Sequence, residues 1–293
     1  MNLKIGNTPL IELTKDIRAL NGVRIFAKLE GDNAGGSVKS RVALAVLEEA
    51  ERKGELQKGN VIVEATSGNM GVGLALIAQE KGYSTNIFLP ENMQGKKSVL
   101  MQKYGAKITL TPANEGMRGA VKRAEEFVKN TPSCFYVNQF RNPVCVEAHY
   151  RTTGKEIWVQ SMGKVDIFVA GFGTGGTLSG TAKYLKEKKP TLRVVAIEPF
   201  LSPLLSKGVA GAHSIQGIGA NFIPPILDVG VIDEVFLATD RGAELCVKWL
   251  KKNFGLSVGT SSGAAFWACL NLAIRAENKG KNIFTIFPDK AMP

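Results

Sequence analysis

The chain has 293 residues, enough for one large or two moderate domains, and no apolar run approaches the length of a membrane span. Residues 1–6 lack the basic region, apolar core and cleavage site of a signal peptide, so we expect a soluble, cytoplasmic protein. The net charge of +11 comes from lysines spread over many expected helices, which argues against nucleic-acid binding and mildly favours anionic ligands. We expect reduced thiols and no metal site, because no metal-like spacing occurs among Cys134, Cys145, Cys246 and Cys269.

The elements alternate along most of the chain. After a short strand in residues 7–11 and a half-buried strand in 23–29, a helix is expected behind Ser37, a good N-cap, ending at Gly54. Further strands are expected at 61–65, 85–89, 107–110, 165–170, 194–197, 232–237 and 283–287. Helices are expected at 70–81, 178–187 and 241–253. Three more are expected: one that ends at residue 104, one that ends near residue 130 and one that follows Gly263. This pattern predicts an α/β protein with two open, twisted, mostly parallel sheets covered by helices.

Two domains follow from this order of elements. We expect a smaller, mobile domain over residues 35–141 and a larger domain made of residues 1–34 and 142–293. Ligands of such sheets bind at the carboxyl ends of the strands, so the active site is expected in the cleft between the domains.

Lys39 lies in the first turn of the expected helix behind Ser37. The positive end of the helix dipole disfavours its ammonium form and makes the neutral, nucleophilic amine easier to reach. A lysine that forms a Schiff base needs this property, although Lys39 is also one of many lysines that could simply be solvated.

Two loops at strand ends suit anionic groups. Thr66, Ser67, Gly68 and Asn69 offer hydroxyl, amide and backbone donors for a carboxylate, or form an ordinary capped turn. Residues 171–177 follow an apolar strand and open a helix, and their glycines let backbone amides surround a phosphate.

The same glycines also fit a dinucleotide-binding fingerprint. Gly171, Gly173 and Gly176 have its spacing, and Glu198 ends the next strand where it could hold a ribose. A nicotinamide-dependent oxidoreductase is therefore an alternative, but it leaves Lys39 and the 66–69 loop without a role. His149 is interpreted as structural. A last loop, residues 259–263, precedes an Ala-rich helix, where a serine could be a plain N-cap.

Taken together, the motifs closely resemble the cysteine synthase (O-acetylserine sulfhydrylase) and cystathionine beta-synthase family over essentially the whole chain. These are fold-type II pyridoxal phosphate enzymes with a tryptophan synthase beta-like architecture. The matching motifs, in order, are residues 7–10, 36–41, 66–69, 173–177, 216–220 and 259–263.

The resemblance implies specific roles. Lys39 matches the lysine that forms the internal aldimine with pyridoxal 5'-phosphate, Ser261 matches the serine at the pyridine nitrogen, and Gly217 lines the mouth of the site. The substrate carboxylate is expected at Thr66, Ser67, Gly68, Asn69 and Gln139, and Asn69 is also expected near the cofactor. The phosphate is expected at Gly173, Thr174, Gly175, Gly176 and Thr177.

The implied reaction is β-replacement through an α-aminoacrylate, most simply cysteine synthesis from O-acetylserine and sulfide. A neutral serine at the ring nitrogen makes the ring a weaker electron sink, which favours loss of a group from Cβ. A cysteine-consuming enzyme that releases hydrogen sulfide is the nearest alternative. Serine racemase or dehydratase activity and a partner-binding protein with a vestigial site are more distant ones. The expected partners are an amino acid and sulfide or a thiol, in a homodimer.

Four positions depart from the family pattern. Proline, aspartate, threonine and glycine are usual where this chain has Ala34, Ser40, Met70 and Asn221. Met70 and Asn221 are expected to flank the substrate, so they bear on the identity of the leaving group.

Overall fold

The computed structural model describes residues 3–14 and 20–291, so the first two residues of the 1–6 segment lie outside the described part. The chain forms two compact units. Unit 1 combines residues 1–5 with 33–145, and unit 2 combines residues 6–32 with 146–293. The expected domains 35–141 and 1–34 plus 142–293, and the mobility of the smaller one, stay predictions.

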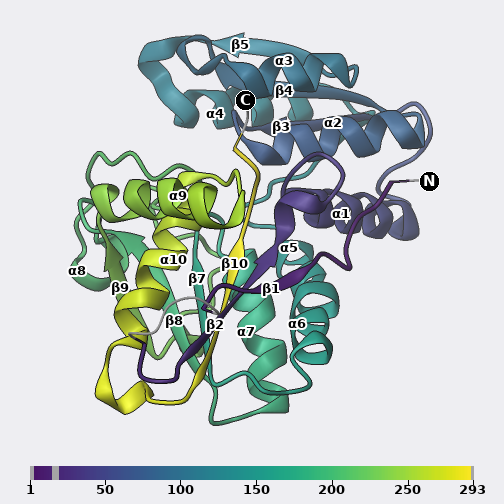
Figure 1. The fold of residues 1–293 in the computed structure, drawn as a ribbon. Coiled ribbons are helices and arrows are strands. Elements are labelled where there is room, and N and C mark those ends of the chain that lie inside the picture. Colours follow the sequence, from purple (N-terminus) through teal and green to yellow (C-terminus); the bar gives the residue numbers. More distant parts are fainter. Residues whose placement is uncertain (1–2, 15–19, 292–293) are drawn as a thin grey trace. The chain divides into compact units, whose positions relative to one another are not determined.

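Unit 1 contains a parallel sheet in the order β5-β4-β3-β6 (Figure 1). Its strands are β3 Val61–Ala65, β4 Ser84–Pro90, β5 Lys107–Thr111 and β6 Cys134–Tyr136. Its helices are α1 Lys39–Lys53, α2 Asn69–Lys81, η2 Glu91–Met93, α3 Lys96–Lys103, η3 Ala113–Glu115 and α4 Gly116–Lys129.

Alternate residues of β4 enter different cores, which is why helices cover both faces of this sheet. Ile87 and Leu89 pack with residues of α2 and α3, whereas Phe88 packs with residues of α4. Successive side chains of a strand point to opposite faces, so a strand that is buried on both sides reads as a continuous apolar run.

The sheet of unit 2 has the order β1-β2-β10-β7-β8-β9, with β1 antiparallel to β2 and the other pairs parallel. Its strands are β1 Leu10–Glu12, β2 Arg24–Leu29, β7 Ile167–Gly171, β8 Arg193–Pro199, β9 Glu234–Ala238 and β10 Asn282–Phe287. After residues 6–32, the chain returns to unit 2 within α5 Val144–His149. The remaining helices are η1 Glu30–Asp32, a π-helical turn Tyr150–Gly154, α6 Lys155–Gln160, α7 Gly176–Lys188, α8 Leu204–Lys207, η5 Val229–Val231, α9 Asp240–Phe254, α10 Thr260–Ala273 and η6 Ala276–Asn278.

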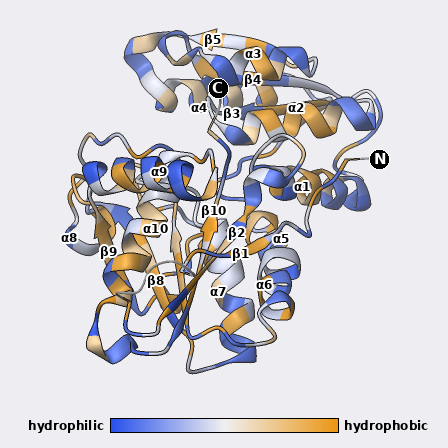
Figure 2. Ribbon diagram, in the orientation of Figure 1, coloured by the Kyte–Doolittle hydropathy of each residue, from blue (hydrophilic) through white to orange (hydrophobic). Residues whose placement is uncertain are grey.

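Both faces of this sheet are also buried. Ile167 and Val169 of β7 pack with α9 and α10, whereas Phe168 and Ala170 pack with α6 and α7. Figure 2 shows hydrophobic colours along the strands and hydrophilic colours on much of α9. In the part of the chain that the structure describes, no helix is long and apolar enough to cross a membrane.

The expected α/β class with mostly parallel sheets is therefore confirmed. Two local expectations are wrong. The helix expected after Gly263 begins at Thr260, because Gly259 is its extended N-cap. Helical segments α5 and α6 and the π-helical turn between them occupy residues 144–160, where the sequence pattern predicted no helix.

Candidate active site

Lys39 is the first residue of α1. Ser37 was expected to be the N-cap, but Val38 holds that position and the Ser37 hydroxyl accepts the backbone N–H of Lys39 at 3.3 Å. The helix ends as expected at Gly54, which has a left-handed φ of 73°. The motif thus places Lys39 at a defined helix start, with Ser37 one residue further out than predicted.

The Lys39 amine lies among protein atoms although the residue as a whole is only half-buried. Burial lowers the pKa of Lys39, and the nearby Glu64 and Cys145 raise that pKa by a smaller amount. The sequence had suggested the helix dipole as a cause, and desolvation is a further cause that only the structure shows. A lysine with a lowered pKa reaches its neutral form more easily, which suits an amine that attacks a carbonyl group.

The 66–69 loop joins β3 to α2. The Thr66 hydroxyl accepts the backbone N–H of Gly68 at 3.1 Å, which holds the loop in a tight turn, and α2 begins at Asn69. Gly73 of α2 lies so close to α1 that a Cβ there would be 3.2 Å from the Lys39 carbonyl group. Close packing of α1 on α2 therefore holds Lys39 and the loop within the same small region of unit 1.

Gln139 joins this region through Glu64, a residue that the sequence analysis missed. The backbone N–H of Gln139 donates to the Glu64 carboxylate at 3.3 Å, and both side chains are buried. Burial raises the pKa of Glu64 to about 8, while hydrogen bonds from the backbone and side chain of Gln139 oppose this increase. Glu64 stands two residues before Thr66 in β3, and that position was the available signal.

The departures from the family pattern are placed as follows. The Ser40 hydroxyl donates to the carbonyl oxygen of Ala34, so these two departures contact each other. Met70 is 1% exposed in α2, and Asn221 is exposed. That Met70 and Asn221 flank the substrate stays a prediction.

The glycine loop of unit 2 connects β7 to α7, which begins at Gly176. A Cβ at Gly173 would overlap the carbonyl oxygen of Gly217, and a Cβ at Gly175 would lie 2.8 Å from Cα of Leu227. Gly175 also has a φ of +91°, which side chains rarely adopt. Gly217 and Leu227 thus leave no space for side chains at Gly173 and Gly175. Backbone N–H groups without side chains beside them, at the start of a helix, form the kind of site that holds a phosphate.

His149 contacts the end of this loop through Thr177. It is fully buried, its Nε2 lies 3.1 Å from the Thr177 hydroxyl, and its Nδ1 lies 2.9 Å from the Thr153 hydroxyl. The π-helical turn Tyr150–Gly154 sets the spacing between His149 and Thr153. The interpretation of His149 as structural was incomplete, because its contact with Thr177 orients a residue of the predicted phosphate site.

Ser261 is buried in the first turn of α10. The Thr260 hydroxyl beside it accepts the backbone N–H of Gln216 at 3.0 Å, which ties the start of α10 to the loop that contains Gly217. Unit 2 therefore brings Gly173, Gly217 and the Ser261 turn into one connected group of loops. That this group and Lys39 line one cleft stays a prediction.

Glu198 is not available to a ribose as the oxidoreductase alternative requires. Its carboxylate oxygens accept the backbone N–H groups of Leu205 and Ser206 at 2.8 and 3.0 Å. Glu198 caps the start of α8, so the fingerprint spacing of the glycines lacks its acidic partner.

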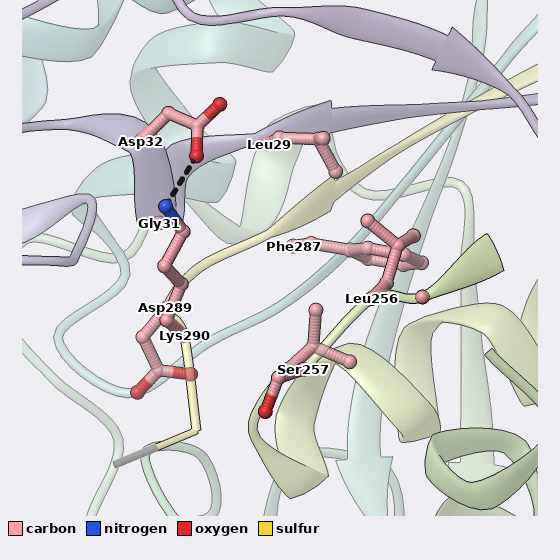
Figure 3. A pocket seen from close by; sticks show the side chains of 10 residues that line it. Leu29, Gly31, Asp32, Leu256, Ser257, Phe287, Asp289 and Lys290 are labelled. Atoms are coloured by element: carbon pink, nitrogen blue, oxygen red, sulfur yellow. Dashed lines mark ion pairs between the residues drawn. The ribbon is translucent and has the colours of Figure 1, made fainter. Parts of the chain in front are cut away.

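A separate cavity of about 210 Å³ lies in unit 2 at the ends of β2 and β10 (Figure 3). Leu256 and Phe287 form an apolar wall of this cavity. Lys290 and Asp32, which also line it, form an ion pair at 2.7 Å. None of its lining residues is a predicted site residue, so this cavity is distinct from the glycine loop.

Comparison with known proteins was consistent over the full length. Residues 1–289 match the family described as pyridoxal-phosphate dependent enzyme. A cysteine synthase of Staphylococcus aureus (strain Mu50) is 44% identical over 285 residues, covering 97% of this chain and 91% of that protein. A cysteine synthase structure from Entamoeba histolytica aligns with a TM-score of 0.94 and 40% identity, covering 98% of this chain and 86% of that one. The structure of a hydrogen sulfide-producing enzyme from Fusobacterium nucleatum aligns with a TM-score of 0.93 and 42% identity, covering 98% and 94%.

Proposed function

Because the chain belongs to the family of pyridoxal-phosphate dependent enzymes, we propose that it makes cysteine by β-replacement, from O-acetylserine and sulfide. The observation that carries this proposal is the pairing, within unit 1, of a lysine of lowered pKa with a loop of donors suited to a carboxylate. An amino acid held by its carboxylate at loop 66–69 would present its Cα to an amine that can accept a proton.

Each predicted residue has a task in this reaction. Residues 173–177 hold the cofactor phosphate, where the close approach at Gly173 and Gly175 leaves only backbone to meet it. Ser261, buried in the first turn of α10, would hold the ring nitrogen, and Gly217 would line the mouth of the site. Bound pyridoxal phosphate supplies the electron sink for charge at the substrate Cα. Lys39 takes the Cα proton, while loop 66–69 and Gln139 orient the substrate and exclude water.

The second candidate is release of sulfide from cysteine. It is favoured by the similarity to the hydrogen sulfide-producing enzyme, which is as close in sequence and fold as the similarity to the Entamoeba cysteine synthase. Both reactions expel a group from Cβ and differ in which group leaves, and loop 66–69 would hold either substrate through its carboxylate.

One assay separates the two candidates. Purified protein loaded with the cofactor is offered O-acetylserine plus sulfide, or cysteine alone. Cysteine formation, sulfide release and the absorbance spectrum of the cofactor are followed. We expect O-acetylserine to be consumed much faster than cysteine. Fast sulfide release with little use of O-acetylserine would establish the second candidate instead, and no spectral response to either compound would refute β-replacement on both.

Replacing Asn69 by alanine is expected to weaken binding of the substrate carboxylate but to leave the cofactor in place. Loss of a charge-assisted hydrogen bond worth about 1.5 to 3 kcal/mol should lower kcat/KM by roughly one to two powers of ten. The cofactor absorbance and steady-state rates measure the two effects. Asn86→Ala is the control, since Asn86 is a buried asparagine of unit 1 that accepts the Thr109 hydroxyl at 2.7 Å. Equal losses in both variants would contradict a specific role for Asn69.

We also propose that the protein is a cytoplasmic homodimer and that the smaller domain, residues 35–141, moves to close on the substrate. Analytical ultracentrifugation tests the oligomeric state. A monomer at micromolar concentration would overturn the proposed dimer without affecting the proposed reaction.

A further inference from the structure

Glu64 connects two chain segments that the proposed reaction needs close together. Strand β3 pairs with β6 up to Val63 and Tyr136, and the last backbone bond runs from the N–H of Val137 to the carbonyl of Val63 at 3.0 Å. Asn138 then takes a left-handed φ of 50°, which turns the chain out of the ladder. The next inward N–H, that of Gln139, donates to the Glu64 side chain at 3.3 Å instead of to a backbone carbonyl.

The second carboxylate oxygen of Glu64 points along its own strand. It accepts the backbone N–H of Ala65 at 3.1 Å, directly before the 66–69 loop begins. One carboxyl group, 2% exposed, therefore bridges the end of β3 and the Gln139 segment where the sheet ladder has stopped. A backbone bond at this point would keep the two segments at strand distance, whereas a longer side chain spaces them further apart.

Glu64 also interacts electrostatically with Lys39. The groups that interact electrostatically with Glu64 are Lys39 of α1, Cys145 of α5 and Tyr136 of β6. Burial raises the pKa of Cys145 to about 12, and burial together with Glu64 raises the pKa of Tyr136, so both remain neutral at physiological pH. In this cluster, burial thus raises the pKa of Glu64 to about 8 and lowers the pKa of Lys39.

We propose that Glu64 is a positioning residue of the β-replacement reaction, which holds Gln139 beside the 66–69 loop. The inference rests on the proposed function. An ionised Glu64 stabilises the Lys39 ammonium ion, and a protonated Glu64 lets the neutral amine form. Glu64 therefore also raises the pKa of Lys39, which gives a second measurable effect of its carboxylate.

The test replaces Glu64 by glutamine, which keeps the size but turns one acceptor into a donor that opposes a backbone N–H. On the full-length protein with the cofactor removed, the pH dependence of Lys39 acetylation by trace acetic anhydride is read by peptide mass spectrometry. Because Glu64 raises the pKa of Lys39, its removal should move the labelling midpoint to lower pH. On the loaded enzyme, KM for the amino-acid substrate should rise roughly tenfold, more than kcat falls.

Glu198→Gln is the matched control. Glu198 is an equally buried carboxylate near the end of a strand, accepting two backbone N–H groups in unit 2. We expect both glutamine variants to lose thermal stability, and only Glu64→Gln to shift the labelling of Lys39. If Glu64→Gln loses stability but leaves both the Lys39 midpoint and KM as in the wild type, Glu64 is merely structural and the proposal is wrong.

Glu64→Asp separates the positioning of Gln139 from the effect of the Glu64 charge on Lys39. It also serves as the test if the glutamine variant fails to fold. Aspartate keeps the charge but is one methylene shorter and no longer reaches Gln139, so the Lys39 midpoint should stay as in the wild type while KM rises. An unchanged KM would overturn the proposed positioning of Gln139. A lowered pH midpoint of Lys39 labelling would show that the charge of residue 64 does not act on Lys39. The labelling needs no turnover, so failure of the proposed reaction with both substrates would be recognised separately.

Discussion

Lys39→Ala is expected to abolish covalent attachment of the cofactor and to lower turnover by roughly two to four powers of ten. In the proposed reaction, Lys39 supplies both the amine that binds the cofactor and the base that takes the Cα proton, and the variant removes both. The half-buried position and lowered pKa of Lys39 make it the lysine best suited to both tasks in the described part of unit 1. Borohydride reduction of the wild-type protein and peptide mapping should label Lys39.

Lys53→Ala provides the control for this experiment. Lys53 lies in the last turn of the same helix, where its ammonium group pairs with Glu49 at 3.4 Å on the surface. Cofactor attachment and turnover should stay at wild-type levels in this variant. Labelling of another lysine, or a Lys39→Ala protein that keeps its full activity, would refute the assignment of Lys39.

Gly173→Ala should lose most of its bound cofactor. The added Cβ would overlap the carbonyl oxygen of Gly217, so the 173–177 loop or the Gly217 loop must move and the phosphate cradle opens. Overpacking of this kind costs about 1 to 3 kcal/mol, which corresponds to roughly a tenfold to hundredfold weaker site if the loop bears the strain. Cofactor occupancy by absorbance and the thermal unfolding temperature measure the outcome.

Gly95→Ala is the matched substitution. Gly95 has an extended φ of −179°, and a Cβ there would meet nothing within 4 Å. This variant should keep its cofactor and unfold within a few degrees of the wild type. Wild-type occupancy in Gly173→Ala would mean that the loop is an ordinary turn and that the phosphate lies elsewhere.

Local patterns were sufficient for the fold class. The two-residue period of a strand, the 3.6-residue period of a helix and the turn preference of glycine each act over a few positions. They predicted β3, the end of α1 at Gly54 and the opening of α7 by the glycine loop, and these predictions are confirmed. The order of the motifs along the chain then carried the resemblance to a family to which the chain belongs.

The supporting residues were decided by tertiary contacts. Glu64 bonds to a residue 75 positions away, and His149 contacts a threonine 28 positions away. Such pairs depend on where β6 ends against β3 and on how the π-helical turn packs on α7, which no local spacing encodes. Burial as a cause of the lowered pKa of Lys39 was missed for the same reason. The sequence shows that a helix begins there, but desolvation depends on all the elements packed around the amine, and only the folded chain brings these together.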